Sequence, residues 1–94
     1  MEFEWDENKN KANQRKHRIS FEEAAEIFRY PMYEMVDLRA DYGEARYIGI
    51  GRNNQMVILV VVYTERGSRI RMISARRANK EEKRLYYDYC TKGY

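Results

Sequence analysis

The sequence predicts a single α+β domain spanning residues 1–94, in which N-terminal helices pack on a four-stranded antiparallel sheet and a C-terminal helix ends the chain. Ninety-four residues are enough for one core but not for two domains. Apolar residues recur at helical spacing before Pro31, and from Met32 onward the period changes to two. The links between the predicted strands are short, which favours an antiparallel meander.

The two predicted helices before the sheet have clear start signals. Asp6 is a good N-cap for a helix that runs to about His17. Ser20 begins the second helix, with Glu23 three residues later as the other half of a capping box, and Pro31 stops it. The first helix is almost entirely polar, so we expect it to lie on the surface.

Strands are predicted at 32–38, 45–51, 56–63 and 69–78. The run 56–63 is apolar on both faces, which is typical of a central strand covered on both sides. Residues 64–68 are expected to form a hairpin turn. Alternation along the last strand places Arg76 on the same face as Ile70 and Met72, and Arg77 on the opposite face. Asn79 is expected to cap the final helix.

Composition excludes several classes of protein. The chain is 44% hydrophobic and 35% charged, which is too apolar for a disordered tail and too charged for a membrane protein. Cys90 is the single cysteine, so an intrachain disulfide and a cysteine zinc cluster are excluded. The longest apolar run is eight residues, and the N-terminus lacks an export signal. We therefore expect a cytoplasmic protein without a cofactor or metal.

Basic residues are concentrated in two clusters. Residues 8–18 hold five Lys or Arg together with His17 and no acid, although residues 1–50 as a whole have 8 basic and 11 acidic side chains. Residues 51–94 have 10 basic and 4 acidic side chains, including five arginines between positions 66 and 77. The guanidinium fork grips phosphate or carboxylate with two bonds. The clusters favour a polyanion or an acidic protein as partner, against the alternative of a solvated face.

Several segments, in order and over about residues 3–90, resemble the BrnT family of toxins from type II toxin–antitoxin systems. The segments are Phe3-Glu4-Trp5-Asp6, Asn13 with Lys16-His17, Ile19-Ser20-Phe21-Glu22-Glu23-Ala24, Tyr47-Ile48-Gly49-Ile50-Gly51, Val61-Val62-Tyr63-Thr64-Glu65-Arg66 and Arg69-Ile70-Arg71-Met72-Ile73-Ser74-Ala75-Arg76-Arg77-Ala78. The Ser-Ala-Arg-Arg-Ala block after Tyr-Thr-Glu-Arg is the most specific. One position departs from the family pattern, because Arg18 stands where glycine is frequent after Lys-His.

The resemblance implies a RelE/ParE-like fold and a ribonuclease that cleaves RNA and stops translation. It also implies a BrnA-like antitoxin that neutralises the toxin and carries a DNA-binding module, so that the complex represses its own operon. If the position of Arg18 requires a left-handed backbone, its side chain adds strain there.

Metal-free RNA cleavage needs a base for the 2′-hydroxyl, cations for the charged phosphorane and an acid for the leaving oxygen. The predicted catalytic residues are Glu65, Arg76 and His17. Glu65 is the carboxylate within the arginine-rich hairpin, with a structural turn residue as the alternative. His17 titrates near neutrality, with a helix-terminal structural role as the alternative. The predicted RNA phosphate-binding residues are Lys16, Arg66, Arg69, Arg77 and Lys80.

A second function stays open at this point: a non-catalytic or gyrase-targeting toxin of the same fold that acts as a binding module. Charge does not separate the two, because both need cations. For the antitoxin, the strand at 32–38 and the tyrosine-rich last helix are the expected docking surfaces.

Overall fold

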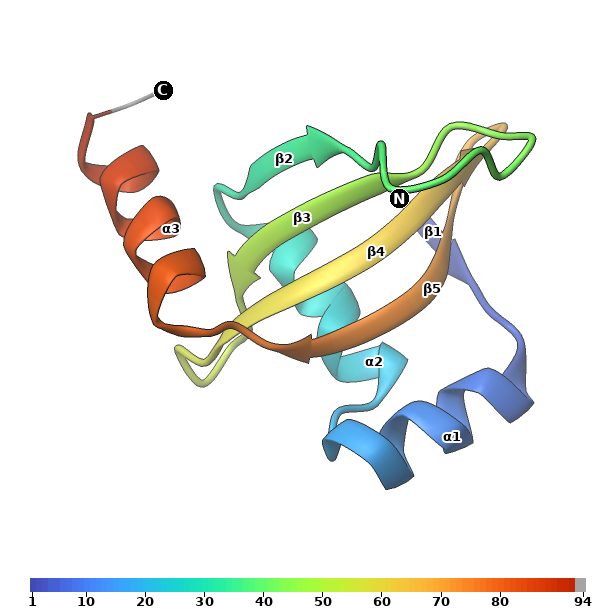
Figure 1. Ribbon diagram of the computed structural model, residues 1–94. Helices are drawn as coiled ribbons and strands as arrows, with labels where there is room; N and C mark the ends of the chain where they lie inside the picture. Colours follow the sequence, from blue (N-terminus) through green and yellow to red (C-terminus); the bar gives the residue numbers. More distant parts are fainter. Residues whose placement is uncertain (93–94) are drawn as a thin grey trace.

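The computed structural model describes residues 1–92 as one five-stranded mixed sheet with helices on both faces (Figure 1). The strands are β1 (Glu2–Glu4), β2 (Tyr33–Val36), β3 (Tyr47–Arg52), β4 (Ile58–Arg66) and β5 (Arg69–Arg77). The helices are α1 (Glu7–His17), α2 (Phe21–Ala24), a 3₁₀ helix η1 (Ala25–Arg29) and α3 (Lys80–Lys92). No helix among these residues is long and apolar enough to cross a membrane.

The strand order is β1-β5-β4-β3-β2, which corrects the predicted four-stranded antiparallel sheet. β1 pairs with β5 in parallel, with Phe3 opposite Ile70. The other three pairings are antiparallel. A parallel partner 67 residues away leaves no local signal, so the pairing of this three-residue strand with β5 could not be predicted from the sequence. The hairpin turn is also tighter than predicted, because β4 continues to Arg66 and β5 begins at Arg69.

The central position of β4 confirms the prediction from its apolar run. Its side chains alternate between two cores. Leu59, Val61 and Tyr63 pack with residues of α2 and η1 on what we call the α1/α2 face. Ile58 and Val60 pack with Tyr86 of α3 on the opposite side, the α3 face. The sheet is thus covered on both sides of its central strand.

Buried asparagines attach the polar helix α1 to the sheet. Asn13 Nδ2 donates to the carbonyl of Ala75 at 2.8 Å, and Asn13 Oδ1 accepts from the Ala75 N–H at 3.1 Å. The side-chain amide thereby pairs with β5 as a neighbouring strand would. Asn10 Oδ1 accepts from the Phe21 N–H at 2.8 Å, which joins α1 to α2. Polarity on this helix therefore marks packing against backbone, not only solvent.

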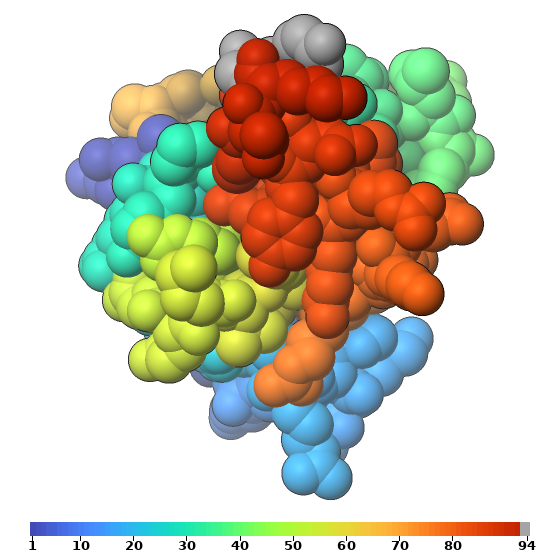
Figure 2. Space-filling model, turned by 90° about the vertical axis from the view of Figure 1, so that its left-hand side faces the viewer, coloured from blue at the N-terminus to red at the C-terminus, as the bar shows by residue number. Residues whose placement is uncertain are grey.

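The predicted N-cap residues of all three α-helices are confirmed, but the Glu23 half of the predicted capping box is not formed, because the Glu23 carboxylate accepts from Asn53 Nδ2 at 3.0 Å instead. Asp6 accepts from the N–H of Asn8 at 2.8 Å, and Ser20 accepts from Glu23 at 3.0 Å. In α3, Asn79 and Glu82 cap each other reciprocally, each bond being 2.8 Å. α3 stands at one end of the sheet, where the turn of residues 52–57 lies beside it (Figure 2).

Candidate active site

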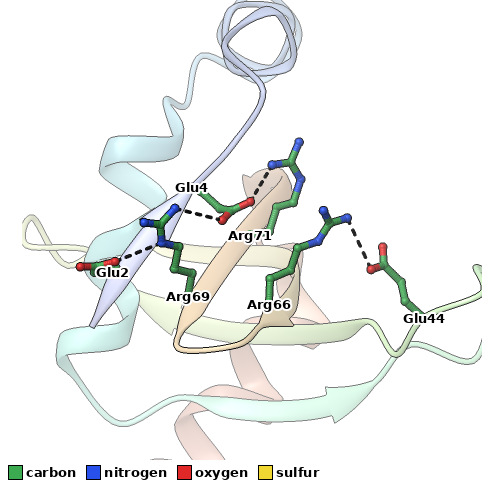
Figure 3. A network of polar contacts seen from close by, with 6 residues as sticks. All are labelled: Glu2, Glu4, Glu44, Arg66, Arg69 and Arg71. Atoms are coloured by element: carbon green, nitrogen blue, oxygen red, sulfur yellow. Dashed lines mark hydrogen bonds and ion pairs between the residues drawn. The ribbon is translucent and has the colours of Figure 1, made fainter.

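The arginines nearest the β4–β5 turn are each paired with a carboxylate (Figure 3). Arg71 Nη1 lies 2.8 Å from Glu4, and Arg69 Nε lies 3.1 Å from Glu2. Arg66 lies 3.5 Å from Glu44 of the loop between β2 and β3. Arg66 and Arg69, two of the predicted phosphate-binding residues, therefore already have carboxylate partners. These guanidinium groups neutralise the acidic strand β1 and the loop.

Glu65 and Arg76, two of the three predicted catalytic residues, are far apart. Glu65 lies opposite Ile70, whose side chain belongs to the α1/α2 core. Arg76 lies opposite Val60, whose side chain belongs to the α3 core. The two positions are five steps apart along β4, which is about 16 Å. The pair therefore occupies opposite faces and different ends of the hairpin.

A β-bulge explains why Arg76 lies on an unexpected face. Val62 pairs with Ser74 but Tyr63 pairs with Met72, so Ile73 is an extra residue in β5. Beyond Ile73, the alternation of side chains between the two faces of the sheet is shifted by one position. Met72 therefore stays on the α1/α2 face, while Ser74 and Arg76 turn to the α3 face. The predicted grouping of Arg76 with Ile70 and Met72 was wrong for this reason.

His17 ends α1, on the α1/α2 side of the sheet, whereas Arg76 lies on the α3 face. It is half-buried and lies one helical turn beyond Asn13, which contacts Ala75. The following residue, Arg18, caps α1 with φ of 61°, so the left-handed backbone expected at this position is present. His17, Glu65 and Arg76 thus do not form one cluster.

Arg76 instead lines a groove of about 340 Å³ on the α3 face, which we call the α3 groove. Its aliphatic floor comes from the two central strands: Ile48, Ile50, Val60 and Val62. The β5 and α3 rim contributes Ser74, Arg76, Glu82 and Leu85, and the β2 rim contributes Met35 and Arg39. The volume is at the lower end of the range for small-ligand sites, ~300–1,000 Å³.

Arg76 and Glu82 form a bidentate pair in the α3 groove. The two Nη–Oε distances are 2.8 and 2.7 Å. Hydrogen bonding to Arg76 lowers the pKa of Glu82, and Glu82 raises the pKa of Arg76. The charge of Arg39 acts on the Arg76 pKa in the opposite direction, as expected for two cations on one site. Both members of the pair are therefore ionised at neutral pH.

Arg39 was not among the residues singled out from the sequence. It follows β2 and is held by Asp37, with Nε–Oδ1 and Nη2–Oδ2 distances both 2.8 Å. An Asp and an Arg two positions apart in a polar loop are indistinguishable from ordinary turn residues in the sequence. Only the sheet order reveals that this loop faces Arg76 across β3 and β4.

Three of the predicted phosphate-binding residues have no carboxylate within 4 Å among residues 1–92. They are Lys16, Arg77 and Lys80, and all three are exposed. α1 runs in the same direction as β5, so its C-terminal end lies toward the end of β5 that carries Arg77 (Figure 1). Unlike the hairpin arginines, these cations remain available to a polyanion. Within the same described residues, no group of three or more His, Cys, Asp or Glu could hold a metal ion.

Comparisons with known proteins agree with this architecture. Residues 5–82 match the model of the family described as ribonuclease toxin, BrnT, of type II toxin–antitoxin systems. The crystal structure of the Brucella abortus ribonuclease toxin BrnT is similar, with 28% identity and a TM-score of 0.64 over 85% of this chain and 99% of that chain. Among curated proteins, no relative matches. The family match covers most of the chain, including every residue that lines the α3 groove except Leu85, and the chain belongs to the BrnT family of ribonuclease toxins of type II toxin–antitoxin systems.

Proposed function

We propose that this toxin is a metal-independent endoribonuclease that cleaves RNA in the α3 groove, blocks translation and so arrests growth in the cytoplasm. The observation that carries the proposal is that Arg39 and Arg76, on the same face of the sheet but on either side of strands β3 and β4, line one groove with an aliphatic floor. Guanidinium groups can supply the charge neutralisation that a phosphodiester requires, and the floor offers an apolar surface to a base or ribose.

The chemistry would proceed by attack of the 2′-oxygen on phosphorus with departure of the 5′-oxygen. Arg76 neutralises the charge that builds on the phosphoryl oxygens. Glu82 is the carboxylate within the α3 groove and would accept the 2′-hydroxyl proton, while solvent protonates the leaving oxygen. Its lowered pKa keeps it ionised but makes it a weak base, so we assign most of the acceleration to the guanidinium groups.

RNA outside the reacting nucleotide would be held by the unpaired cations. Lys16, Arg77 and Lys80 are exposed and free of carboxylates within the described chain, so each can contact a phosphate. Arg66 and Arg69 are already paired and would contribute less.

The proposed antitoxin is BrnA-like, and the complex would repress its own operon through the antitoxin's DNA-binding module. The surface of the toxin that binds this antitoxin would include β2, the edge strand that pairs with β3. Val36 of β2 and Leu38 after it are 53% and 86% exposed, and Tyr87 of α3 is 54% exposed. An edge strand with exposed apolar side chains suits pairing with an added strand or helix. Loss of antitoxin binding on Leu38→Asp, with cleavage retained, would support this surface.

The test of the proposed activity is cleavage of a labelled single-stranded RNA in EDTA. Wild type should cut it, Arg76→Ala should not, and Arg69→Ala should cut normally. Cleavage that needs added metal would overturn the metal-independent mechanism. Intact RNA under all conditions, together with growth arrest in cells, would support the non-catalytic binding toxin instead.

A further inference from the structure

Asp37 is a buried carboxylate in the loop directly after β2. Its side chain has no exposed surface, whereas the side chain of its partner Arg39 is 65% exposed. Burying a carboxylate is costly unless its hydrogen bonds are satisfied. Here Asp37 accepts from Nε and Nη2 of Arg39 at 2.8 Å and from the Arg39 N–H at 3.1 Å.

This pair joins residues only two positions apart, so it connects no distant parts of the chain. The ion pair between Arg71 and Glu4 is different, because it ties together strands 67 residues apart. Asp37 is itself anchored, since its N–H donates to the Arg46 carbonyl at 2.8 Å beside β3. What the Asp37 pair fixes is therefore the direction of one guanidinium group, and that group lies on the rim of the α3 groove.

We propose that Arg39 is the second phosphate-binding cation of the α3 groove and that Asp37 is the positioning residue that orients it. This inference rests on the proposed function of the α3 groove. Arg39 and Arg76 come from opposite sides of the floor formed by β3 and β4, so a phosphate between them would be neutralised from two directions. Asp37 accepts hydrogen bonds from Nε and Nη2 of Arg39, and the rest of the Arg39 guanidinium remains open to solvent.

Preorientation matters because the phosphorane exists only briefly. A cation that is already aimed at it needs no reorganisation during the reaction, whereas a mobile arginine must first be ordered. Arg39 therefore belongs among the catalytic residues. Asp37 acts only through Arg39, which gives the two residues different signatures in a double-mutant cycle.

The experiment measures single-turnover cleavage of a labelled single-stranded RNA at saturating protein, with thermal unfolding of each variant. Arg39→Ala should slow cleavage about 100-fold. Asp37→Ala should slow it about tenfold, through misplacement of the guanidinium. The double variant Asp37→Ala/Arg39→Ala should cleave at the rate of Arg39→Ala alone. Arg71→Ala, which removes an equally short ion pair outside the α3 groove, should cleave as wild type.

The outcomes separate this inference from the proposed function. If Arg76→Ala slows cleavage but Arg39→Ala does not, the inference fails and the proposed function stands. If neither variant slows cleavage, the α3 groove is not the active site. A double variant slower than Arg39→Ala by the full Asp37 effect would overturn the positioning role. Should Asp37→Ala fail to fold, Asp37→Asn replaces it, and the exposed Arg39 variant still decides the catalytic role.

Discussion

The two ends of β5 have similar sequences, Arg69-Ile70-Arg71 and Ala75-Arg76-Arg77, but different surroundings. At the hairpin end, residues 69–71, the outer edge pairs with β1 and both arginines meet glutamates of that strand. At the distal end, residues 75–77, the edge is held by the side chain of Asn13. There Arg76 lines the α3 groove and Arg77 has no carboxylate partner in the described chain.

This difference teaches that a basic sequence shows where cations lie but not which of them are already neutralised. The glutamates that pair with Arg69 and Arg71 are 67 residues away in sequence. Exposed ion pairs contribute only up to ~1 kcal/mol each. Their main consequence here is to offset positive charge at the hairpin end. At the distal end Arg76 is also paired, with Glu82, but Arg77 has no carboxylate partner in the described chain and can attract RNA.

The largest expected effect is on cleavage by variants at the two ends. Arg76→Ala should reduce the single-turnover rate by about 100- to 1,000-fold, because it removes a donor aimed at the developing charge. Arg69→Ala, a matched change at the hairpin end, should leave the rate unchanged. Equal losses in both variants would mean that the two ends do not differ in function.

Asn13→Ala should cause the next largest effect, on stability. The change leaves the N–H and carbonyl of Ala75 without partners and should lower the free energy of unfolding by about 3 kcal/mol. Glu2→Ala at the hairpin end should cost less than ~1 kcal/mol, because its ion pair with Arg69 is exposed. Urea unfolding of both variants measures the contrast, and a loss at Glu2 as large as that at Asn13 would contradict it.

RNA affinity should also distinguish the ends. The double variant Arg77→Ala/Lys80→Ala should bind a non-cleavable 2′-O-methyl RNA about tenfold more weakly. The slope of its log affinity against log salt should fall by about 0.7 for each lost phosphate contact. The charge-matched double variant Arg66→Ala/Arg69→Ala should keep the wild-type slope, since its cations are already paired. A lower slope in the second variant would show that the hairpin end also contacts RNA.

The carboxylate of Asp37, which holds Arg39, predicts how stability depends on pH. Arg39 holds the pKa of Asp37 below its ordinary value of 3.8. A carboxyl whose pKa is lowered on folding stabilises the protein above its unfolded-state pKa, and this contribution is lost as pH falls further. Asp37→Asn should therefore be less stable than wild type at pH 7, and the difference should shrink progressively below about pH 4. A difference independent of pH from 7 to 2 would show that the charge of Asp37 does not stabilise the fold.

The smallest expected effect concerns two left-handed residues near the two ends. Gly67 in the β4–β5 turn has φ of 62°, and Arg18 at the end of α1 has φ of 61°. Glycine adopts this backbone without strain, whereas arginine does not. Arg18→Gly should raise the free energy of unfolding by about 0.5–1 kcal/mol, and Gly67→Ala should lower it by a similar amount. Destabilisation by Arg18→Gly would indicate that the arginine side chain makes a stabilising contact.

Local signals in the sequence predicted much of the fold. The caps Asp6, Ser20 and Asn79 and the central strand β4 follow from interactions within a few residues of each other. The parallel pairing of β1 with β5 was missed because the partner strand is distant and three residues carry no periodicity. Asn13 was read as surface polarity because its backbone partner, Ala75, appears only in the folded chain.

The candidate site was harder to predict for a different reason. One inserted residue at Ile73 moves Arg76 to the other face of the sheet, and alternation alone cannot locate a bulge. Arg39 lines the same groove because it follows β2, which pairs with β3 on the side of the groove floor away from β5. The composition shows that the second half of the chain is rich in arginine, but the face on which each arginine lies depends on register.

The most direct test of the central claim is methyl NMR of the protein with a non-cleavable 2′-O-methyl RNA. If RNA occupies the α3 groove, the methyl resonances of Ile48, Ile50, Val60 and Val62 should shift on titration. Those of Leu59 and Val61, which belong to the core on the opposite face, should move little. Binding that leaves all four floor residues unshifted would contradict the account.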